Sequence, residues 1–307
     1  MTSAEFQLEP TAARPRDVPI LRIALPNKGR LAQDTRDLFN DAGLEVRASS
    51  DRALKAALGA DFEAIFVRAQ DIPELVSDGA ADAGVTGLDL IAENRRGVIP
   101  KLDLGFGRCR LSMAARDESG LDDFRQLPPR TRVATSFPNI TARFCAESGL
   151  DLEIVPISGA AEIAPHLGIA DVIVDLVSTG STLKTNGLRE IGTIMWSTAQ
   201  LVVAQDRASW IATKEAALQE LCSALESVTS ARGQRYLMAN VPRDRLDEVR
   251  QILPGLNGPT VINVLDGGKH VAVHAVVAAS AIYRTIANLK AIGGEGILVT
   301  RIERLMK

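Results

Sequence analysis

The sequence predicts an α/β protein built from two lobes, followed by a smaller α+β domain. Through most of the chain, short apolar segments alternate with segments whose apolar residues recur at helical spacing, which indicates parallel sheets covered by helices. The last third instead has the order strand, helix, strand, strand, helix, strand, which is the ferredoxin-like pattern. A chain of 307 residues has the length for two or three such domains.

Composition and charge exclude several classes of protein. Hydrophobic residues make up 46% and charged residues 24% of the chain, which is ordinary for a globular protein in water. The net charge of −3 provides no broad basic surface, so we predict no nucleic-acid partner. No apolar run has the length of a membrane span, and residues 1–19 lack a signal-peptide core. We therefore expect a cytoplasmic protein without a membrane partner, in which residues 1–19 are a flexible tail.

The first lobe is expected at residues 20–113 together with 193–207. A predicted strand at 200–204 stands alone between segments that look like connectors, so we expect it to return to the sheet of this lobe. The other predicted strands, each followed by a helix-forming segment, lie at 21–25, 64–67 and 83–87. The second lobe is expected at residues 114–192. Its predicted strands lie at 132–135, 153–157 and 171–175, with helices at 140–148 and 160–167.

The third domain is expected at residues 213–307, where the pattern changes. After an apolar helix face at 218–228, the predicted strands lie at 236–241, 260–265, 271–277 and 297–299, with helices at 246–253 and 282–289. A module of this order often senses a small molecule, although a fold alone does not establish a function.

The most informative motif follows the apolar strand that delivers Asp175. A loop rich in glycine and hydroxyl side chains comes directly after it: Ser178, Thr179, Gly180, Ser181 and Thr182. Ligands of open α/β sheets bind beyond the carboxyl ends of the strands, and backbone N–H groups in such a loop can surround a phosphate. Because the Asp175 carboxylate can accept hydrogen bonds from two ribose hydroxyls, the motif predicts a site for a 5-phosphoribosyl group. The alternative is an ordinary polar turn after a buried strand.

Glu162 opens a predicted helix after another strand. Its carboxylate could hold a ribose hydroxyl or a Mg²⁺ ion bound to pyrophosphate. It is equally explained as a solvated carboxylate in the first turn of a helix, where the helix dipole favours it.

The first lobe supplies the cations, which are Lys28, Arg30, Arg52 and Arg68. A triphosphate and a pyrophosphate together carry about seven negative charges, so several cations have to converge on them. Any one of these side chains alone is more often a surface ion-pair partner. Thr86 and Asp89, around a glycine turn, add a predicted adenine or ribose contact, or else cap a helix.

The sequence shows no metal-ligand spacing and no nucleophile paired with a base. The three cysteines and three histidines are scattered, so the metal ligands, if any, are not indicated. The absence of a Ser-His-Asp or Cys-His arrangement fits a transfer reaction in which the substrate is itself the nucleophile.

Together these motifs closely resemble the ATP phosphoribosyltransferases that open histidine biosynthesis. The resemblance runs from about Leu21 to the C-terminus, and the matching stretches are 25–31, 67–73, 84–89, 159–162, 175–183, 236–238 and 254–260. The stretch 175–183 is the most specific, and the stretches 236–238 and 254–260 resemble the long form of the family.

The resemblance implies two lobes like those of type II periplasmic binding proteins and an ACT-like regulatory third domain. It implies ATP and phosphoribosyl pyrophosphate as substrates, Mg²⁺ as cofactor, and a homohexamer in exchange with dimers. Adenine N1 of ATP would attack the anomeric carbon, pyrophosphate would leave, and N1-(5-phosphoribosyl)-ATP would form. The catalytic residues implied are Lys28, Arg30 and Asp175. Histidine would inhibit by binding the third domain, where we assign Asn240, Gly293 and Gly294 to the effector site.

Two alternatives remain open. Two lobes around a cleft also describe a solute-binding protein, a class that usually carries an export signal. A non-catalytic regulatory relative would be expected to have lost the phosphate loop, which this chain retains.

Overall fold

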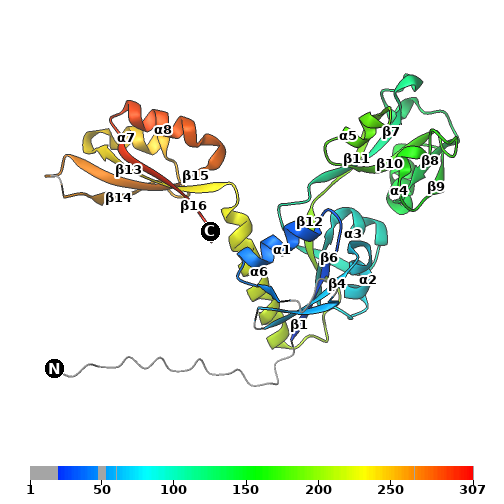
Figure 1. Cartoon of the computed structure of the whole chain (residues 1–307), viewed down its shortest axis with the longest axis horizontal. Coiled ribbons are helices and arrows are strands. Elements are labelled where there is room, and N and C mark those ends of the chain that lie inside the picture. The colour runs from blue at the N-terminus through cyan, green and yellow to red at the C-terminus, as the bar shows by residue number, and fades with distance from the viewer. Residues whose placement is uncertain (1–19, 48–52, 60, 266, 307) are drawn as a thin grey trace. The chain divides into compact units, whose positions relative to one another are not determined.

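The computed structural model describes residues 20–47, 53–59, 61–265 and 267–306. The chain forms two compact units, Met1–Thr35 with Val46–Leu221, and Arg36–Glu45 with Cys222–Lys307 (Figure 1). The predicted tail at residues 1–19 and the predicted ATP-binding residue Arg52 lie outside the described residues.

The first sheet of the first unit has seven strands in the order β2-β3-β4-β1-β5-β12-β6. Strands β4, β1 and β5 run parallel, whereas β12 is antiparallel to both of its neighbours. The predicted return of the strand near residues 200–204 to this sheet is therefore confirmed. The strands are β1 (Leu21–Pro26), β2 (Val46–Arg47), β3 (Lys55–Leu58), β4 (Phe62–Val67), β5 (Ala83–Gly87), β6 (Val98–Asp103) and β12 (Ala199–Ala204), and the helices are α2 (Ile72–Ser77) and α3 (Leu88–Asn94). Helix α1 (Ala32–Asp41) is divided between the two units, because its residues from Arg36 onward belong to the second.

The second sheet of this unit has five strands in the order β11-β7-β10-β8-β9. The strands β9, β8 and β10 run parallel, and β7 is antiparallel to both β10 and β11. These strands are β7 (Cys109–Arg116), β8 (Thr131–Thr135), β9 (Leu152–Pro156), β10 (Val172–Val177) and β11 (Leu188–Ser197), and the helices are α4 (Pro138–Ser148) and α5 (Ser181–Thr185).

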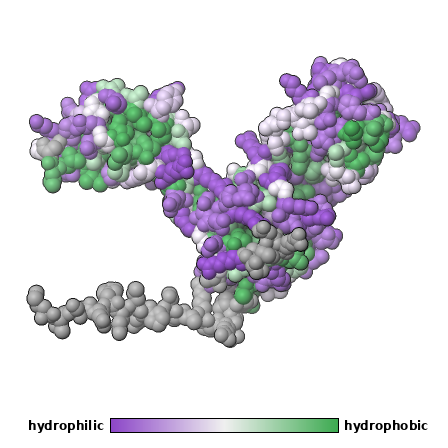
Figure 2. All heavy atoms as spheres, viewed as in Figure 1, coloured by the Kyte–Doolittle hydropathy of each residue, from purple (hydrophilic) through white to green (hydrophobic). Residues whose placement is uncertain are grey.

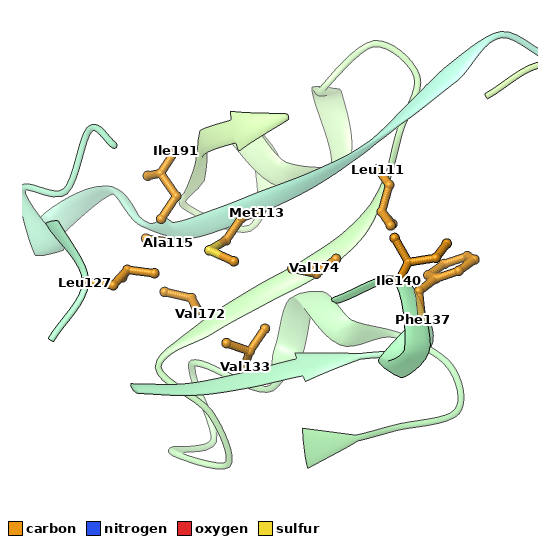
Figure 3. Packing of buried hydrophobic residues seen from close by; sticks show 10 residues of the cluster. All are labelled: Leu111, Met113, Ala115, Leu127, Val133, Phe137, Ile140, Val172, Val174 and Ile191. Carbon is orange, nitrogen blue, oxygen red and sulfur yellow. The ribbon is translucent and has the colours of Figure 1, made fainter. Parts of the chain in front are cut away.

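Apolar alternation builds the core under this second sheet. Side chains from four neighbouring strands, β11, β7, β10 and β8, and from α4 point into one cluster, as Figure 3 shows. Leu111 and Met113 come from β7, Val172 and Val174 from β10, and all are fully buried or nearly so. The cluster anchors β10, whose carboxyl end carries the predicted phosphate loop.

The structure corrects the sequence prediction at several points. The predicted helix at 160–167 is a short 3-10 turn, Ala161–Ile163, because Pro165 has no N–H to continue a helix. Strands β2, β3, β6, β7 and β11 were not predicted, and the supposed connector before β12 is largely β11. The predicted lobe limits at 113/114 and 192/193 fall inside β7 and β11, which pair throughout in the second sheet.

The second unit contains an antiparallel sheet in the order β14-β15-β13-β16. This is the ferredoxin-like strand order that the sequence predicts. Its elements are β13 (Gln234–Pro242), α7 (Leu246–Ile252), β14 (Thr260–Asn263), β15 (His270–Ala278), α8 (Ile282–Ala291) and β16 (Glu295–Arg301), after the C-terminal part of α6 (Ala212–Ala231). The buried residues of β13 and β15 pack with Val249 and Leu289 of the two helices, which cover one face of the sheet.

The overall fold class is thus confirmed as α/β. In each lobe a parallel core is extended by an antiparallel strand that arrives from the other lobe, as in type II periplasmic binding proteins, and a C-terminal α+β unit follows. Figure 2 shows hydrophobic residues gathered on part of the second unit's surface, and exposed large hydrophobic residues of this unit include Val261, Ile262, Tyr283 and Leu298.

Candidate functional site

A pocket of about 140 Å³ lies at the carboxyl end of β10. This volume is smaller than the roughly 300–1,000 Å³ of pockets that enclose a whole drug-sized ligand, so it suits a phosphate and part of a sugar. All of the predicted phosphoribosyl-binding residues except Ser181 line it. The lining consists of Glu162, Asp175, Leu176, Val177, Ser178, Thr179, Gly180, Thr182 and Leu183.

Asp175 is the most perturbed group of this pocket. Burial raises the pKa of its carboxyl to about 6, against an ordinary 3.8, and the nearby Glu162 carboxylate raises this pKa further. The backbone N–H of Leu176 donates to Asp175 Oδ1 at 2.7 Å, which lowers the pKa and offsets part of the effect. A carboxylate held in this way is poorly solvated, so it gains more than a surface carboxylate would from a ribose hydroxyl or a cation.

The loop after β10 has the geometry of an anion cradle. Gly180 adopts φ +83°, a left-handed conformation that a side chain would strain, and α5 begins at the next residue. The Thr179 and Ser181 hydroxyl oxygens lie 2.9 Å apart and share a hydrogen bond. The Ser181 N–H donates to Thr179 Oγ1 at 3.4 Å within the loop. The first N–H groups of a helix have no partner within the helix, so a phosphate can replace this long contact and bind these groups together with the hydroxyls.

An ion pair supports this loop from below. The Arg110 guanidinium donates to both carboxylate oxygens of Glu190, with Nε at 2.6 Å from Oε2, and its Nη1 donates to the Ser178 carbonyl at 3.3 Å. The pairing with Arg110 lowers the pKa of Glu190. Glu190 Oε1 would lie 3.6 Å from a Cβ placed at Gly180, so the ion pair contacts the loop at Gly180 as well as at Ser178.

The predicted cations of the first lobe differ in their surroundings. Arg30 donates to both carboxylate oxygens of Asp89, at 3.1 and 3.3 Å, and also to the Gly107 carbonyl. Lys28 and Arg68 are exposed. In the described part of the chain, neither of them has a carboxylate within 4.0 Å, so their charges are available to an anionic ligand.

Thr86 and Asp89 are held inside the lobe. The Thr86 side chain is fully buried, and its hydroxyl donates to the Ala69 carbonyl at 2.7 Å. Asp89 is 1% exposed and accepts hydrogen bonds from Arg30 and from the Ser197 hydroxyl. This geometry favours a positioning role for both side chains, with Asp89 orienting Arg30, over direct contact with a nucleotide.

Comparison with known proteins identifies the family. A family model described as ATP phosphoribosyltransferase matches residues 68–227, and one described as HisG, C-terminal domain matches residues 231–304. The chain is 64% identical over 292 residues to an ATP phosphoribosyltransferase of Gemmatimonas aurantiaca, and the match covers 94% of this chain and 100% of that protein. This chain belongs to the ATP phosphoribosyltransferase family. The relative from Halorubrum lacusprofundi is 43% identical over 301 residues, 93% of this chain and 100% of that protein.

A solved member of the ATP phosphoribosyltransferase family shares the fold. The structure is an ATP phosphoribosyl transferase (HisG:HisZ) complex from Thermotoga maritima, in which the matching chain is 30% identical with a TM-score of 0.57. The match covers 99% of that chain but 67% of this one. This member of the family is therefore longer than its Thermotoga relative, consistent with the match of the C-terminal family model.

The structure brings the residues assigned to an effector site close together in the second unit. Asn240 of β13 pairs with Glu295 of β16. Gly293 adopts φ +87°, and a Cβ there would lie 3.2 Å from Pro242 Cγ. The Gly294 N–H donates to the Leu289 carbonyl at 2.7 Å. Asn240 and the turn at Gly293–Gly294 thus lie at one end of the same strand pair, and their role in effector binding stays a prediction.

The residues fit a divalent metal held jointly with substrate. Within the described ranges there is no group of three or more His, Cys, Asp and Glu side chains that could hold a metal alone. Glu162 and Asp175 nevertheless line one pocket, and Mg²⁺ in phosphate-binding enzymes is commonly bound by one or two carboxylates together with substrate phosphates. The chemistry of the family implies a divalent metal ion, without specifying which.

Among the described residues, no helix combines the length and apolar character needed to span a membrane.

Sequence reasoning missed Arg110, Glu190 and Ser197. Arg110 and Glu190 are 80 residues apart, and their pairing depends on the register of β7 with β11. A signal existed in Cys109–Arg116, where Arg110 interrupts an otherwise largely apolar strand. A charged residue in such a strand predicts a buried or half-buried partner.

Proposed function

We propose that this chain condenses ATP with phosphoribosyl pyrophosphate to form N1-(5-phosphoribosyl)-ATP and pyrophosphate, the first step of histidine biosynthesis, in the cytoplasm. The observation that carries the proposal is the single pocket that gathers Asp175, Glu162 and the hydroxyl-rich loop at the end of β10. Membership of the ATP phosphoribosyltransferase family supports the same reaction.

The proposed roles follow from charge and position. The loop from Ser178 to Thr182 binds the 5-phosphate through backbone N–H groups and hydroxyls. Asp175 and Glu162 accept hydrogen bonds from the ribose hydroxyls and would hold Mg²⁺, which neutralises charge on the pyrophosphate when bound. The proposed catalytic cations Lys28 and Arg30 bind ATP together with Arg68 and Arg52.

The attacking atom in this reaction is a neutral ring nitrogen. A strong general base is therefore not required, and the main tasks of the protein are orientation and stabilisation of the charge that develops on pyrophosphate. Asp89 contributes by holding the Arg30 guanidinium in place through two hydrogen bonds. Thr86 contributes through the packing of β5, where its hydroxyl ties the strand to the Ala69 carbonyl.

The test is incubation of the full chain with ATP, phosphoribosyl pyrophosphate and Mg²⁺. Attachment of a ribosyl group at N1 of adenine produces new absorbance in the near ultraviolet. The expected result is an increase that requires both substrates and Mg²⁺. A protein that binds both substrates and produces no such absorbance would be a binding or regulatory protein, contrary to the proposal.

We further propose that histidine inhibits through the C-terminal domain, within our predicted limits of 213–307, and that the protein assembles as a homohexamer in exchange with dimers. Separate regulation is supported by a ferredoxin-like unit none of whose described residues lines the pocket at β10. The exposed apolar side chains of β14 and β16 support assembly through this unit. Inhibition at a distance requires that histidine bind one conformational state more tightly than another.

The test of this part measures mass by light scattering, with and without histidine, alongside initial rates. Noncompetitive inhibition by histidine together with a shift towards the larger assembly is expected. Simple competition with ATP would contradict the allosteric proposal.

A further inference from the structure

We infer that the second unit contains a binding site for a nucleoside phosphate, separate from the pocket at β10. A cavity of about 690 Å³ lies within this unit. Its volume is within the range of roughly 300–1,000 Å³ typical of small-molecule sites. The charged residues of its lining are Asp41, Arg232, Arg235, Arg301 and Glu303.

Two of the arginines are direct neighbours on adjacent strands of the sheet. Arg235 of β13 and Arg301 of β16 are direct partners in the antiparallel ladder, and both line the cavity. Like charges directly opposite each other on neighbouring strands destabilise a sheet. Over the ranges that the structure describes, neither guanidinium has a carboxylate within 4.0 Å. Arg235 Nη1 donates to the Gln234 carbonyl, which is neutral and leaves the repulsion in place. A bound anion would neutralise this pair.

The chemistry of the lining favours phosphate as the anionic group. A guanidinium presents a planar fork of donors that matches phosphate oxygens in a bidentate manner, and two forks side by side can hold one phosphate. Arg304 adds a fourth guanidinium near this region, beside Arg232, Arg235 and Arg301 of the lining, and its Nη2 donates to the Asp41 carbonyl at 3.3 Å.

The acidic residues of the same lining indicate that the ligand is more than an inorganic anion. Asp41 and Glu303 would repel a free polyphosphate, but their carboxylates accept hydrogen bonds from hydroxyl or amino groups. A nucleoside phosphate combines both kinds of group: a phosphate for Arg235 and Arg301, and ribose hydroxyls or an exocyclic amine for Asp41 and Glu303. Inorganic pyrophosphate offers the first kind alone.

The experiment is titration calorimetry on the full chain with AMP, with GMP and with inorganic pyrophosphate. The test variant is Arg235→Gln/Arg301→Gln, and Arg284→Gln, an exposed arginine of α8 outside the lining, is the matched control. Lys28→Ala separates this site from the proposed catalytic pocket. We expect the wild type to have one class of nucleotide sites whose affinity falls at least tenfold in the double variant. The affinity of this class of sites should be unchanged in the Arg284 and Lys28 variants.

Two outcomes would overturn the inference. Unchanged nucleotide stoichiometry and affinity in the double variant would show that the two arginines hold no ligand, and pyrophosphate binding here as tightly as AMP would exclude a nucleoside-specific site. Thermal melting provides the folding control: without ligand the double variant should melt no lower than the wild type, because a like-charge pair has been removed. If the double variant does not fold, Arg235→Lys/Arg301→Lys preserves charge but loses the fork geometry, and its nucleotide binding should weaken in the same assay.

Discussion

Asp175→Asn should separate stability from function at the pocket of β10. The native carboxyl has its pKa raised to about 6 by burial, so its ionised form is disfavoured in the folded protein. The difference from the ordinary value of 3.8 corresponds to about 3 kcal/mol of destabilisation at neutral pH. Asparagine removes the charge, and its carbonyl can still accept the Leu176 N–H. We therefore expect a ligand-free protein that is more stable by up to about 3 kcal/mol.

The sign of the pH dependence provides an internal control. The folded pKa lies above the unfolded one, so between about pH 4 and 6 the folded state binds more protons than the unfolded state. The ionised Asp175 carboxylate therefore destabilises the wild type fully above pH 6. As pH falls through 6 the carboxylate becomes protonated, and the free energy of unfolding of the wild type rises. The difference between Asp175→Asn and the wild type should be largest at pH 7.5 and should shrink towards pH 5.

The assay pairs thermal melting at these two pH values with steady-state kinetics. Loss of a charge-assisted hydrogen bond to ribose costs about 1.5–3 kcal/mol, so kcat/KM for phosphoribosyl pyrophosphate should fall about 10- to 150-fold or more. A variant that melts below the wild type at pH 7.5 would show that Asp175 is a structural residue. Unchanged kinetics at limiting phosphoribosyl pyrophosphate would refute its role in binding.

Three further predictions test other parts of the site. Lys28→Ala should raise the KM for ATP about tenfold without lowering the melting temperature. Arg30→Ala should raise this KM and also destabilise the protein by about 1–3 kcal/mol, because buried Asp89 loses its guanidinium partner. Equal melting temperatures of the two variants would contradict this distinction. Glu190→Gln should raise the KM for phosphoribosyl pyrophosphate about two- to tenfold and leave that for ATP unchanged, since it loosens the support of the phosphate loop. Asn240→Leu should retain basal turnover and require more histidine for inhibition, and an unaltered inhibition curve would remove Asn240 from the effector site.

Local sequence signals predicted much of the fold. Strands such as Leu21–Pro26 and Val172–Val177 are largely buried, so they appear as apolar runs interrupted by a single charged residue, and the third domain shows its alternation clearly. Strands with interspersed polar residues were missed. In β11, Leu188–Ser197, residues such as Arg189 and Glu190 interrupt the pattern, and two register irregularities break the pairing with β7. Periodicity could not identify such a strand.

The candidate site shows a similar division between local and long-range information. Asp175 and Ser178–Thr182 lie close together in the sequence, so a single motif predicted that they form one site. The turn after β9 places Glu162 in the same pocket. The Arg110–Glu190 pair and the burial of Asp89 depend on contacts between distant segments. A sequence cannot distinguish an arginine that faces a ligand from one that is held by a buried carboxylate, which is why Lys28 and Arg30 looked equivalent.

The most direct test of the proposed reaction measures both of its products together. Wild type and Asp175→Asn are incubated with ATP, Mg²⁺ and phosphoribosyl pyrophosphate that carries an isotopic label in its ribose, and mass spectrometry follows the adenine nucleotide while released pyrophosphate is quantified. We expect equimolar amounts of pyrophosphate and of an ATP adduct that bears the labelled phosphoribosyl group, both strongly reduced in the variant. Release of pyrophosphate without the labelled adduct, or equal yields from the two proteins, would contradict the proposal.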